Sequence, residues 1–188
     1  MTAPHRIATG RLVLRRHTMA DLDAFTSFML DAQAPRWMAS TPEQKTAQGA
    51  RQMLEYVIAS YDSPQPVYSL TIADAKTDAY LGSCGMHPLD GEAGMQVYYT
   101  VLPAHQGRGL ATEAARAMIA AAAGAGVERF VAFVVPANAA SVRVAQKLGF
   151  VDEGPVVTPE AKGAAGHLSL QGRRHALSRE AALLLDTA

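Results

Sequence analysis

The sequence has one cysteine, few aromatic residues and no excess of charge of either sign. Cys84 alone cannot form an internal disulfide or supply the four ligands of a structural zinc site, so both kinds of scaffold are excluded. The 17 Lys and Arg residues balance the 17 Asp and Glu residues, which argues against general binding of nucleic acid or acidic membranes. None of the six histidines forms an i, i+4 pair, so no metal centre is expected.

Long apolar runs are also missing. Although 49% of the residues are hydrophobic, no stretch reaches the roughly 18 apolar residues that span a bilayer. The segment Met1–Leu14 carries Arg6 and Arg11 and no apolar block of signal-peptide length, which predicts a cytoplasmic protein without membrane contacts. A chain of 188 residues suits a single domain, and we expect residues 1–188 to form it.

Alternation of apolar and polar residues predicts a series of strands. They are expected at Arg11–Arg15, Tyr68–Ile72, Ala79–Met86, Met95–Leu102 and Phe130–Val135, with two short strands at His167–Leu170 and His175–Leu177. Turn residues at Lys76–Asp78 and Asp90–Gly91 predict an antiparallel meander in the middle of the chain. Gly172 is expected to form the turn between the last two strands.

Helical spacing and capping residues predict five helices. Thr18 with Asp21 is a capping box, and Thr41–Gln44 offers a capping hydroxyl, a proline at N1 and a glutamine at N3. The first predicted helix follows Thr18. The others run from Thr41 to about Ser60, from Gln106 to about Gly124, from Asn138 to Gly149 and from Ser178 to Leu185. The chain is therefore predicted to be α/β.

A glycine loop, Gln106–Ala111, lies between the predicted strand Met95–Leu102 and the next helix. Gly107 and Gly109 let the backbone approach a ligand, and the free N–H groups and dipole of the first helical turn favour an anion. A phosphate cradle is the functional interpretation, and an ordinary turn is the alternative. The loop lacks the Gly-Lys-Ser/Thr ending of nucleotide triphosphate sites and does not fit the dinucleotide-binding pattern.

Two linked motifs resemble the GNAT superfamily of N-acetyltransferases. The family's Gln/Arg-x-x-Gly-x-Gly/Ala motif is matched by Gln106, Gly109 and Ala111, and its Asn-x-x-Ser helix ending in Lys-Leu-Gly-Phe by Asn138–Phe150. The opening Thr9–Arg15 is similar to the branch that contains ribosomal-protein alanine N-acetyltransferases. The resemblance covers about residues 9–151. It implies a central, mixed, twisted sheet of about six to seven strands with helices on both faces.

The resemblance also implies the reaction. An acetyl group would pass from acetyl-CoA to a primary amine, such as a protein or peptide N-terminal α-amine, in a ternary complex without a metal. The pyrophosphate would meet the N–H groups of the glycine loop, and the pantetheine chain would lie against the preceding strand. The implied cofactor-binding residues are Val101, Leu102, Gln106, Gly107, Arg108, Gly109, Leu110, Ala111, Asn138 and Ser141.

The resemblance implies a general acid and leaves the base open. Many relatives carry an acid tyrosine at the position of Ala145, so Ser141, one turn into its helix, is the expected acid for the CoA thiolate. Relatives often carry a glutamate base at the position of Gln96, which cannot accept a proton usefully. Glu92 is the base that we expect, and the alternatives are Asp90 and His87.

Other functions stay open at this point. Gln96 and Ala145, at the usual base and acid positions, also suit a non-catalytic acyl-CoA-binding or regulatory module. A plain interaction domain is another alternative, in which the glycine loop would be only a turn. If the protein is an enzyme, its acceptor amine could also be a small molecule. A monomer or a homodimer is expected. Cys84 is predicted to be a buried thiol, and Glu113 is predicted to pair with Arg116 on the helix surface.

Overall fold

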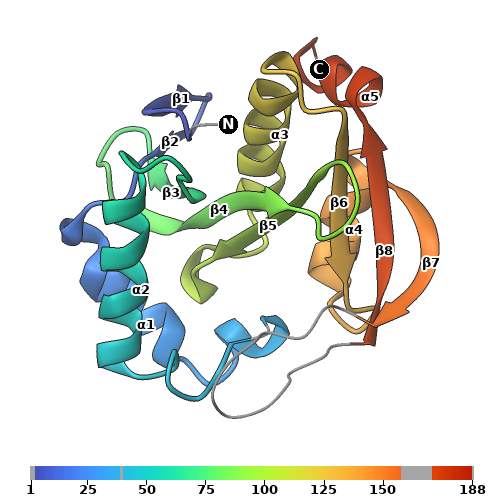
Figure 1. The fold of residues 1–188 in the computed structure, drawn as a ribbon. Coiled ribbons are helices and arrows are strands. Elements are labelled where there is room, and N and C mark those ends of the chain that lie inside the picture. The colour runs from blue at the N-terminus through green and yellow to red at the C-terminus, as the bar shows by residue number, and fades with distance from the viewer. Residues whose placement is uncertain (1–2, 39, 158–170, 188) are drawn as a thin grey trace.

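One eight-stranded sheet organises the chain in a computed structural model that describes residues 3–38, 40–157 and 171–187 (Figure 1). The strands are β1 Arg6–Ala8, β2 Leu12–Arg15, β3 Tyr68–Asp74, β4 Tyr80–Pro88, β5 Met95–Val101, β6 Arg129–Val134, β7 Val151–Val157 and β8 Gln171–Ser178. Their order in the sheet is β1-β2-β3-β4-β5-β6-β8-β7. All neighbours pair antiparallel except β5 and β6, which are parallel.

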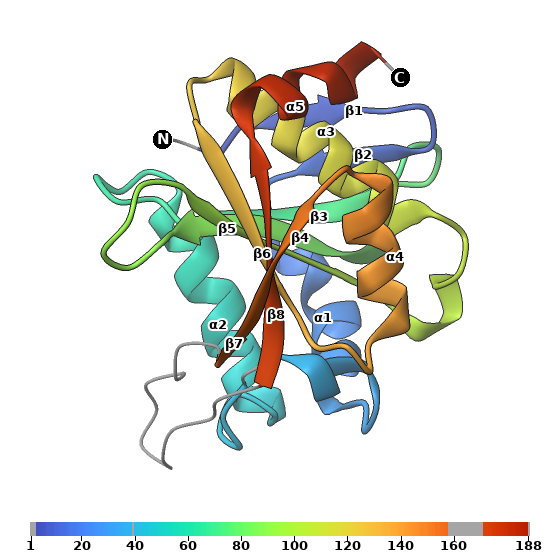
Figure 2. The same ribbon diagram turned by 90° about the vertical axis from the view of Figure 1, so that its right-hand side faces the viewer.

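Helices cover both faces of the sheet. They are α1 Leu22–Leu30, α2 Ala47–Ser60, α3 Leu110–Gly124, α4 Ala139–Lys147 and α5 Arg179–Leu183, with 3-10 turns η1 Met19–Asp21, η2 Ala34–Trp37, η3 Pro103–His105 and η4 Leu184–Thr187. Figures 1 and 2 show α1 and α2 together on one face and α3 with α4 on the other. Each face of β5 therefore meets a different set of helices.

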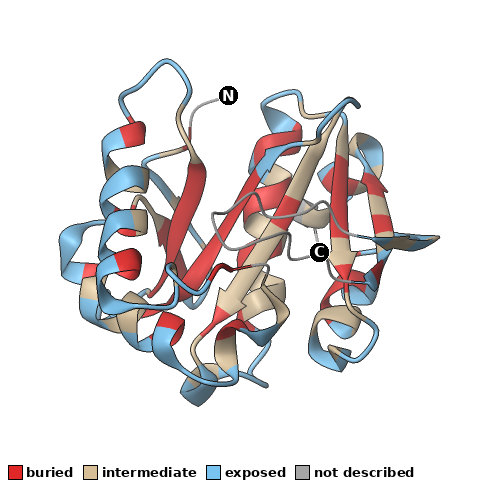
Figure 3. Ribbon diagram, turned by 60° about the horizontal axis from the view of Figure 1, so that its bottom comes forward, coloured by how far each residue is buried: buried red, intermediate tan, exposed pale blue. Residues whose placement is uncertain are grey.

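The largest core lies between the central strands and α3. Leu70, Cys84, Phe130, Met118 and Ile119 are all fully buried there. Figure 3 shows the buried residues running along the central strands and the inner side of the helices. The alanine runs of α3 make this packing close, because small side chains let the helix approach the sheet. A second cluster, formed by Phe28, Met29 and Ala50, joins α1 to α2.

Most predicted elements are confirmed, and the differences have local causes. Thr41 and Gln44 do exchange capping bonds, but they close only one turn; α2 begins at Ala47, with the Thr46 side chain accepting from the Gly49 N–H at 3.0 Å. The helix expected from Gln106 begins at Leu110, because the loop before it turns through left-handed glycines.

The strand count exceeds the expected six to seven because short β1 and edge strand β7 also join the sheet. Gly172 lies within β8 rather than at a turn, and a Cβ there would lie 3.1 Å from the Val134 carbonyl oxygen, so glycine allows the close approach of β6. The strand expected at His167–Leu170 falls outside the described residues.

A strand split between β5 and β6 is the main irregularity of the sheet. The two strands pair only at Met95 with Phe130 and at Gln96 with Val131, although β5 continues to Val101 and β6 to Val134. Beyond Gln96, β5 therefore has a paired edge toward β4 and a backbone edge that diverges from β6.

Candidate active site

The glycine loop follows β5 directly and has the backbone form expected of an anion cradle. Gly107 and Gly109 have φ values of 75° and 78°, a left-handed form that glycine adopts without strain. Gly109 is the N-cap of α3, and no side chain caps this helix, so its first N–H groups remain available. The Gln106 amide donates to the Val101 carbonyl at 2.9 Å, which ties the loop to the end of β5.

Arg11 clamps the loop to the N-terminal strands. Its Nη1 donates to the Arg108 carbonyl at 3.0 Å, and its Nε donates to Glu113 at 2.7 Å. The other Glu113 oxygen accepts from the Thr9 hydroxyl at 2.6 Å. The expected pair of Glu113 with Arg116 is therefore wrong: Arg116 donates instead to a backbone carbonyl at the C-terminal end. Sequence spacing along one helix could not reveal a partner about a hundred residues away.

The two residues expected to contact pantetheine differ in their backbone bonding. Leu102 donates its N–H to the Leu81 carbonyl at 2.8 Å and accepts from the His105 N–H at 2.9 Å, which argues against a cofactor role for its backbone. Because N–H directions alternate along a strand, the Val101 N–H points away from β4, toward the strand split. Of the two, the geometry favours Val101.

Asn138 and Ser141 open α4, as the sequence predicts. The Asn138 side chain accepts from the Ser141 N–H at 3.2 Å and is therefore an N-cap. The Ser141 Oγ lies 3.0 Å from the hydroxyl of Tyr99 on β5, and either oxygen can be the donor. Sequence reasoning missed Tyr99; its position in a strand that faces the Asn-x-x-Ser helix was the available signal.

Glu92 lies in an ion pair. Both of its oxygens accept from Arg174 at 2.6 Å, and Arg174 also pairs with Glu153. The hydrogen bonds from Arg174 lower the pKa of Glu92, and a carboxylate held in this way is a weak proton acceptor, which argues against Glu92 as the base. Asp90 is exposed in the β4–β5 connection, His87 is exposed near the end of β4, and Gln96, its partner on β5, is partly buried.

Four further residues pack against their neighbours in the fold. Cys84 is fully buried, and this burial raises the pKa of its thiol to about 12, so it stays protonated. Ala145 is buried against the core. Trp37 and Met38 follow α1, where Met38 packs against the Phe28 cluster and Arg36 stacks over the Trp37 ring at 4.9 Å.

Comparison with known protein families identifies the family of this chain. A model of the acetyltransferase (GNAT) domain matches residues 11–151, about the range of the resemblance. The chain belongs to the GNAT acetyltransferase family. It is therefore an acyltransferase enzyme, and its eight-stranded mixed sheet is a GNAT fold.

Three relatives illustrate the similarity. An uncharacterized N-acetyltransferase of Bacillus licheniformis is 29% identical over 149 residues, 78% of this chain and 82% of the relative. A structure named as a putative ribosomal-protein-serine acetyltransferase from Vibrio cholerae has a TM-score of 0.73 at 20% identity and covers 95% of this chain and 99% of its own. Mycobacterium smegmatis RimJ, in complex with CoA-disulfide, has a TM-score of 0.70 at 20% identity, with 95% and 92% covered.

The described part of the chain has neither a membrane-spanning helix nor a metal-binding cluster. None of the helices described there is long and apolar enough to cross a membrane. Within the same residues, no group of three or more His, Cys, Asp or Glu side chains could hold a metal ion.

Proposed function

We propose that this GNAT enzyme transfers the acetyl group of acetyl-CoA to a primary amine by direct attack in a ternary complex. The observation that carries the proposal is the left-handed glycine loop opening α3 without a side-chain cap, next to the strand split. An uncapped helix N-terminus favours a phosphate group, and the split exposes strand backbone that a pantetheine chain can pair with. RimJ, a protein of the same fold, forms a complex with CoA-disulfide, which supports a CoA compound as the ligand.

In the proposed complex, the pyrophosphate lies against the N–H groups of the glycine loop through Ala111. Arg108 is exposed beside it and adds positive charge. The Val101 N–H faces the pantetheine side of the split, and the Asn138 amide, whose oxygen caps α4, presents its NH₂ group to the same chain. The acetyl group then lies at the split, where backbone N–H groups of β5 stabilise the oxyanion that forms.

Ser141 is the proposed general acid. When the amine nitrogen bonds to the acetyl carbon, the carbon–sulfur bond breaks and the electron pair leaves on sulfur, which then takes a proton. The Ser141 hydroxyl can give that proton and recover one from the neighbouring Tyr99 hydroxyl, while the proton that the amine nitrogen loses passes to water, which restores the Tyr99 phenol. Burial raises the pKa of Tyr99, so this phenol stays protonated near neutral pH. We assign no proton transfer to Glu92, because Arg174 holds both of its oxygens.

We further propose a protein or peptide N-terminal α-amine as the acceptor. The opening Thr9–Arg15 is similar to the ribosomal-protein alanine acetyltransferase branch, and the Vibrio cholerae neighbour is named as a putative ribosomal-protein-serine acetyltransferase. A small-molecule amine is the alternative acceptor. The balanced net charge does not select a strongly acidic or basic partner.

The first test is calorimetric titration with acetyl-CoA, CoA, ATP and NAD. Binding of acetyl-CoA and CoA, without binding of ATP or NAD, is expected. Turnover is then measured by thiol release with a panel of short peptides starting in Ala or Ser, a polyamine, a free amino acid and an aminoglycoside. No CoA binding would overturn the cofactor assignment, and CoA binding without turnover of any amine would favour a non-catalytic acyl-CoA-binding module.

A further inference from the structure

The turn between β1 and β2 contacts the first turn of α3. Thr9 and Arg11 lie in the β1–β2 turn, and Glu113 lies in the first turn of the helix. Figure 2 shows the β1–β2 hairpin beside α3, and β2 contacts that helix. Because α3 begins directly after the glycine loop, this contact places the hairpin next to the proposed pyrophosphate site.

Four contacts hold the Glu113 carboxylate. Its Oε1 accepts from the Thr9 hydroxyl at 2.6 Å and from the Arg11 N–H at 3.0 Å. Its Oε2 accepts from Arg11 Nε at 2.7 Å and lies 2.6 Å from Arg11 Nη2. Burial would raise the pKa of Glu113, but the hydrogen bonds from Thr9 and Arg11 outweigh it and lower that pKa. Glu113 is therefore ionised at neutral pH, and its two bonds to the guanidinium fix the plane of that group.

The remaining nitrogen of the guanidinium reaches the glycine loop. Arg11 Nη1 donates to the Arg108 carbonyl at 3.0 Å. Among the described residues, no other donor bonds this carbonyl, because helical bonding begins one residue later, where the Gly109 carbonyl accepts from the Glu113 N–H at 3.1 Å. The Arg11 carbonyl also accepts from the Ala75 N–H at 3.0 Å, so the main chain of Arg11 is held as well. Arg11 therefore determines which way the Arg108 carbonyl points.

The direction of this carbonyl sets the direction of the Gly109 N–H. The two groups belong to one trans peptide unit, so they point in opposite directions. Within the described part of the chain, the Gly109 N–H has no hydrogen-bond partner. It points away from Arg11 and β2. Since β5 and β6 follow β2 in the order of the sheet, this direction leads toward the strand split.

The glycine loop does not fix this direction by itself. A flip of the peptide between Arg108 and Gly109 would reverse the sign of the Gly109 φ, which is 78°, and glycine adopts both signs without strain. In the flipped form, the Arg108 carbonyl oxygen would face a bound phosphate group and repel it. The hydrogen bond from Arg11 favours the form in which the N–H faces that group instead.

We infer that Arg11 and Glu113 are positioning residues for the cofactor. Glu113 orients the Arg11 guanidinium, which holds the peptide between Arg108 and Gly109 with its N–H toward the pyrophosphate. This inference rests on the proposed function, which places the pyrophosphate at the glycine loop. Neither side chain has to contact the cofactor, and the ion pair adds no net charge to the site. Its contribution is to preorganise a backbone donor before the cofactor binds.

Calorimetric titration with CoA tests the inference without an acceptor amine. The Arg11 side chain is 55% exposed, so Arg11→Gln should leave the fold intact. It should weaken CoA binding by about 10-fold, the loss expected for a hydrogen bond to a charged group. Because Arg11→Gln leaves the Glu113 charge without its cation, the double variant Arg11→Gln/Glu113→Gln is measured beside it and should be about as weak. Wild-type affinity in the double variant would mean that Arg11 only neutralises Glu113, and the inference would be wrong.

NMR of protein labelled with ¹⁵N-glycine observes the Gly109 amide itself. The Gly109→Ala spectrum assigns its signal. In the wild type, saturation with CoA should move the Gly109 amide proton downfield, since this proton then bonds a phosphate oxygen. In both variants of Arg11, saturated with CoA, that shift should be lost. A shift equal to that of the wild type would show that the N–H keeps its direction without Arg11, which contradicts the inference.

Arg179 offers a matched control at the other end of α3. Its Nε donates to the Ala123 carbonyl at 3.0 Å, and its Nη1 donates to Glu128 at 3.0 Å, so it also joins a backbone carbonyl to a carboxylate. Arg179→Gln should keep the wild-type affinity for CoA and the wild-type shift of the Gly109 amide. An equal loss of CoA affinity in Arg11→Gln and Arg179→Gln would reduce the effect to a general loss of stability and overturn the inference.

The outcomes separate this inference from the proposed function. If the wild type binds CoA but acetylates no amine in the panel, the proposed transfer fails, and the CoA titrations still decide the role of Arg11. If the wild type acetylates a peptide but Arg11→Gln binds CoA normally, the inference is wrong and the proposed function stands. If the wild type does not bind CoA, both fail.

Discussion

Tyr98 and Tyr99 are neighbours in β5, yet their side chains lie on opposite faces of the sheet, and each bonds a serine in different surroundings. The Tyr98 hydroxyl bonds Ser69, which is buried within β3, and the Tyr99 hydroxyl bonds Ser141, which is partly exposed in the first turn of α4. Ser69 has its hydrogen committed to His17, whereas either oxygen of the Tyr99–Ser141 pair can donate. The first pair therefore has a fixed direction inside the fold, and the second is suited to release a proton.

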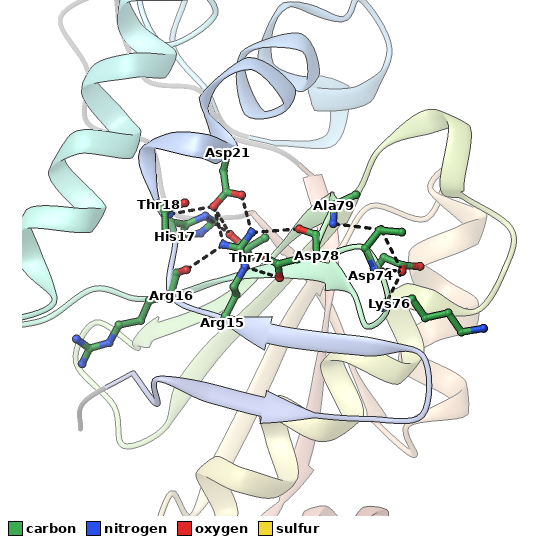
Figure 4. A network of polar contacts seen from close by, with 11 residues as sticks. Arg15, Arg16, His17, Thr18, Asp21, Thr71, Asp74, Lys76, Asp78 and Ala79 are labelled. Atoms are coloured by element: carbon green, nitrogen blue, oxygen red, sulfur yellow. Dashed lines mark hydrogen bonds and ion pairs between the residues drawn. The ribbon is translucent and has the colours of Figure 1, made fainter.

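This difference follows from what lies behind each serine. On the α1/α2 face, Ser69 belongs to a buried chain of hydrogen bonds whose members are Ser69, His17, Thr71 and Asp21. The ion pair of Asp21 with Arg15 anchors this chain, and Arg15 has a side-chain exposure of only 15% (Figure 4). The Asp21 carboxylate takes the single hydrogen of the Thr71 hydroxyl, so Thr71 accepts from His17. The neutral His17 ring in turn accepts from Ser69.

On the α3/α4 face, the Asn138 side chain holds the Ser141 N–H, and the Ser141 hydroxyl shares with Tyr99 a hydrogen bond in which either oxygen can donate. An anchored network fixes direction, and an unanchored hydroxyl keeps a transferable proton.

The largest expected effect tests the α3/α4 face. Ser141→Ala should lower kcat by about 10²- to 10⁴-fold, the usual contribution of an acid–base group, with little change in the affinity for acetyl-CoA. Thiol release and calorimetry measure the two quantities. Ser83→Ala is the matched control, because Ser83 also bonds a tyrosine hydroxyl but is buried within β4. Equal turnover in Ser141→Ala and wild type would remove Ser141 from the mechanism.

The second prediction tests the anchored network through stability. The pKa of His17 is about 4 in the folded state and about 6.5 when unfolded. The unfolded chain therefore binds more protons between these values, so stability should be complete above pH 6.5 and should fall as the pH drops toward 4. The share of His17 in that loss is about 3 kcal/mol.

Urea unfolding of the wild type and His17→Gln at several pH values between 7 and 4 isolates this share. In the middle of the range, the free energy of unfolding should change more steeply with pH in the wild type than in His17→Gln, by the equivalent of up to one bound proton. His5→Gln, which makes the same substitution at an exposed histidine outside the network, serves as the control. Identical slopes for wild type and His17→Gln would contradict a neutral, buried His17.

A third prediction concerns the two ends of α3. Gly109 and Gly126 both have positive φ, at 78° and 96°, so alanine at either position should destabilise the fold by about 1–2 kcal/mol. Only Gly109→Ala should also weaken acetyl-CoA binding, by about 10-fold, since it disturbs N–H groups of the cradle. Thermal unfolding and calorimetry compare the variants. Equal acetyl-CoA affinities would show that the glycine loop is only a turn.

The smallest effect is expected at Glu92. Because Arg174 holds both of its oxygens at the exposed end of the sheet, Glu92→Gln should change kcat by less than about twofold at pH 7. The pH profile of kcat/KM should likewise keep its shape. A large fall in kcat, rescued at high pH, would reinstate Glu92 as the base that the sequence suggested.

The sequence predicted the local elements well because their signals are local. Asn138 as an N-cap and Gly149 with φ of 77° needed only neighbouring residues, and so did the turn at Asp78. It predicted the start of α2 wrongly, because Thr41 and Thr46 both carry capping signals and the choice between them depends on packing around Gly49. Edge strands β1 and β7 were missed, since their pairing partners, rather than their own alternation, make them strands.

By itself, the sequence determined the family, the glycine loop and the Asn-x-x-Ser helix, since these are runs of adjacent residues whose spacing carries their meaning. Tertiary structure alone decided the partners of side chains that are far apart in the chain. In the fold, Glu113 bonds Arg11 and Glu92 bonds Arg174. His17, Ser69 and Tyr98 are connected by consecutive hydrogen bonds. Hydrogen bonds of this kind depend on distances of about 3 Å between strands, which only the pairing register of the sheet fixes.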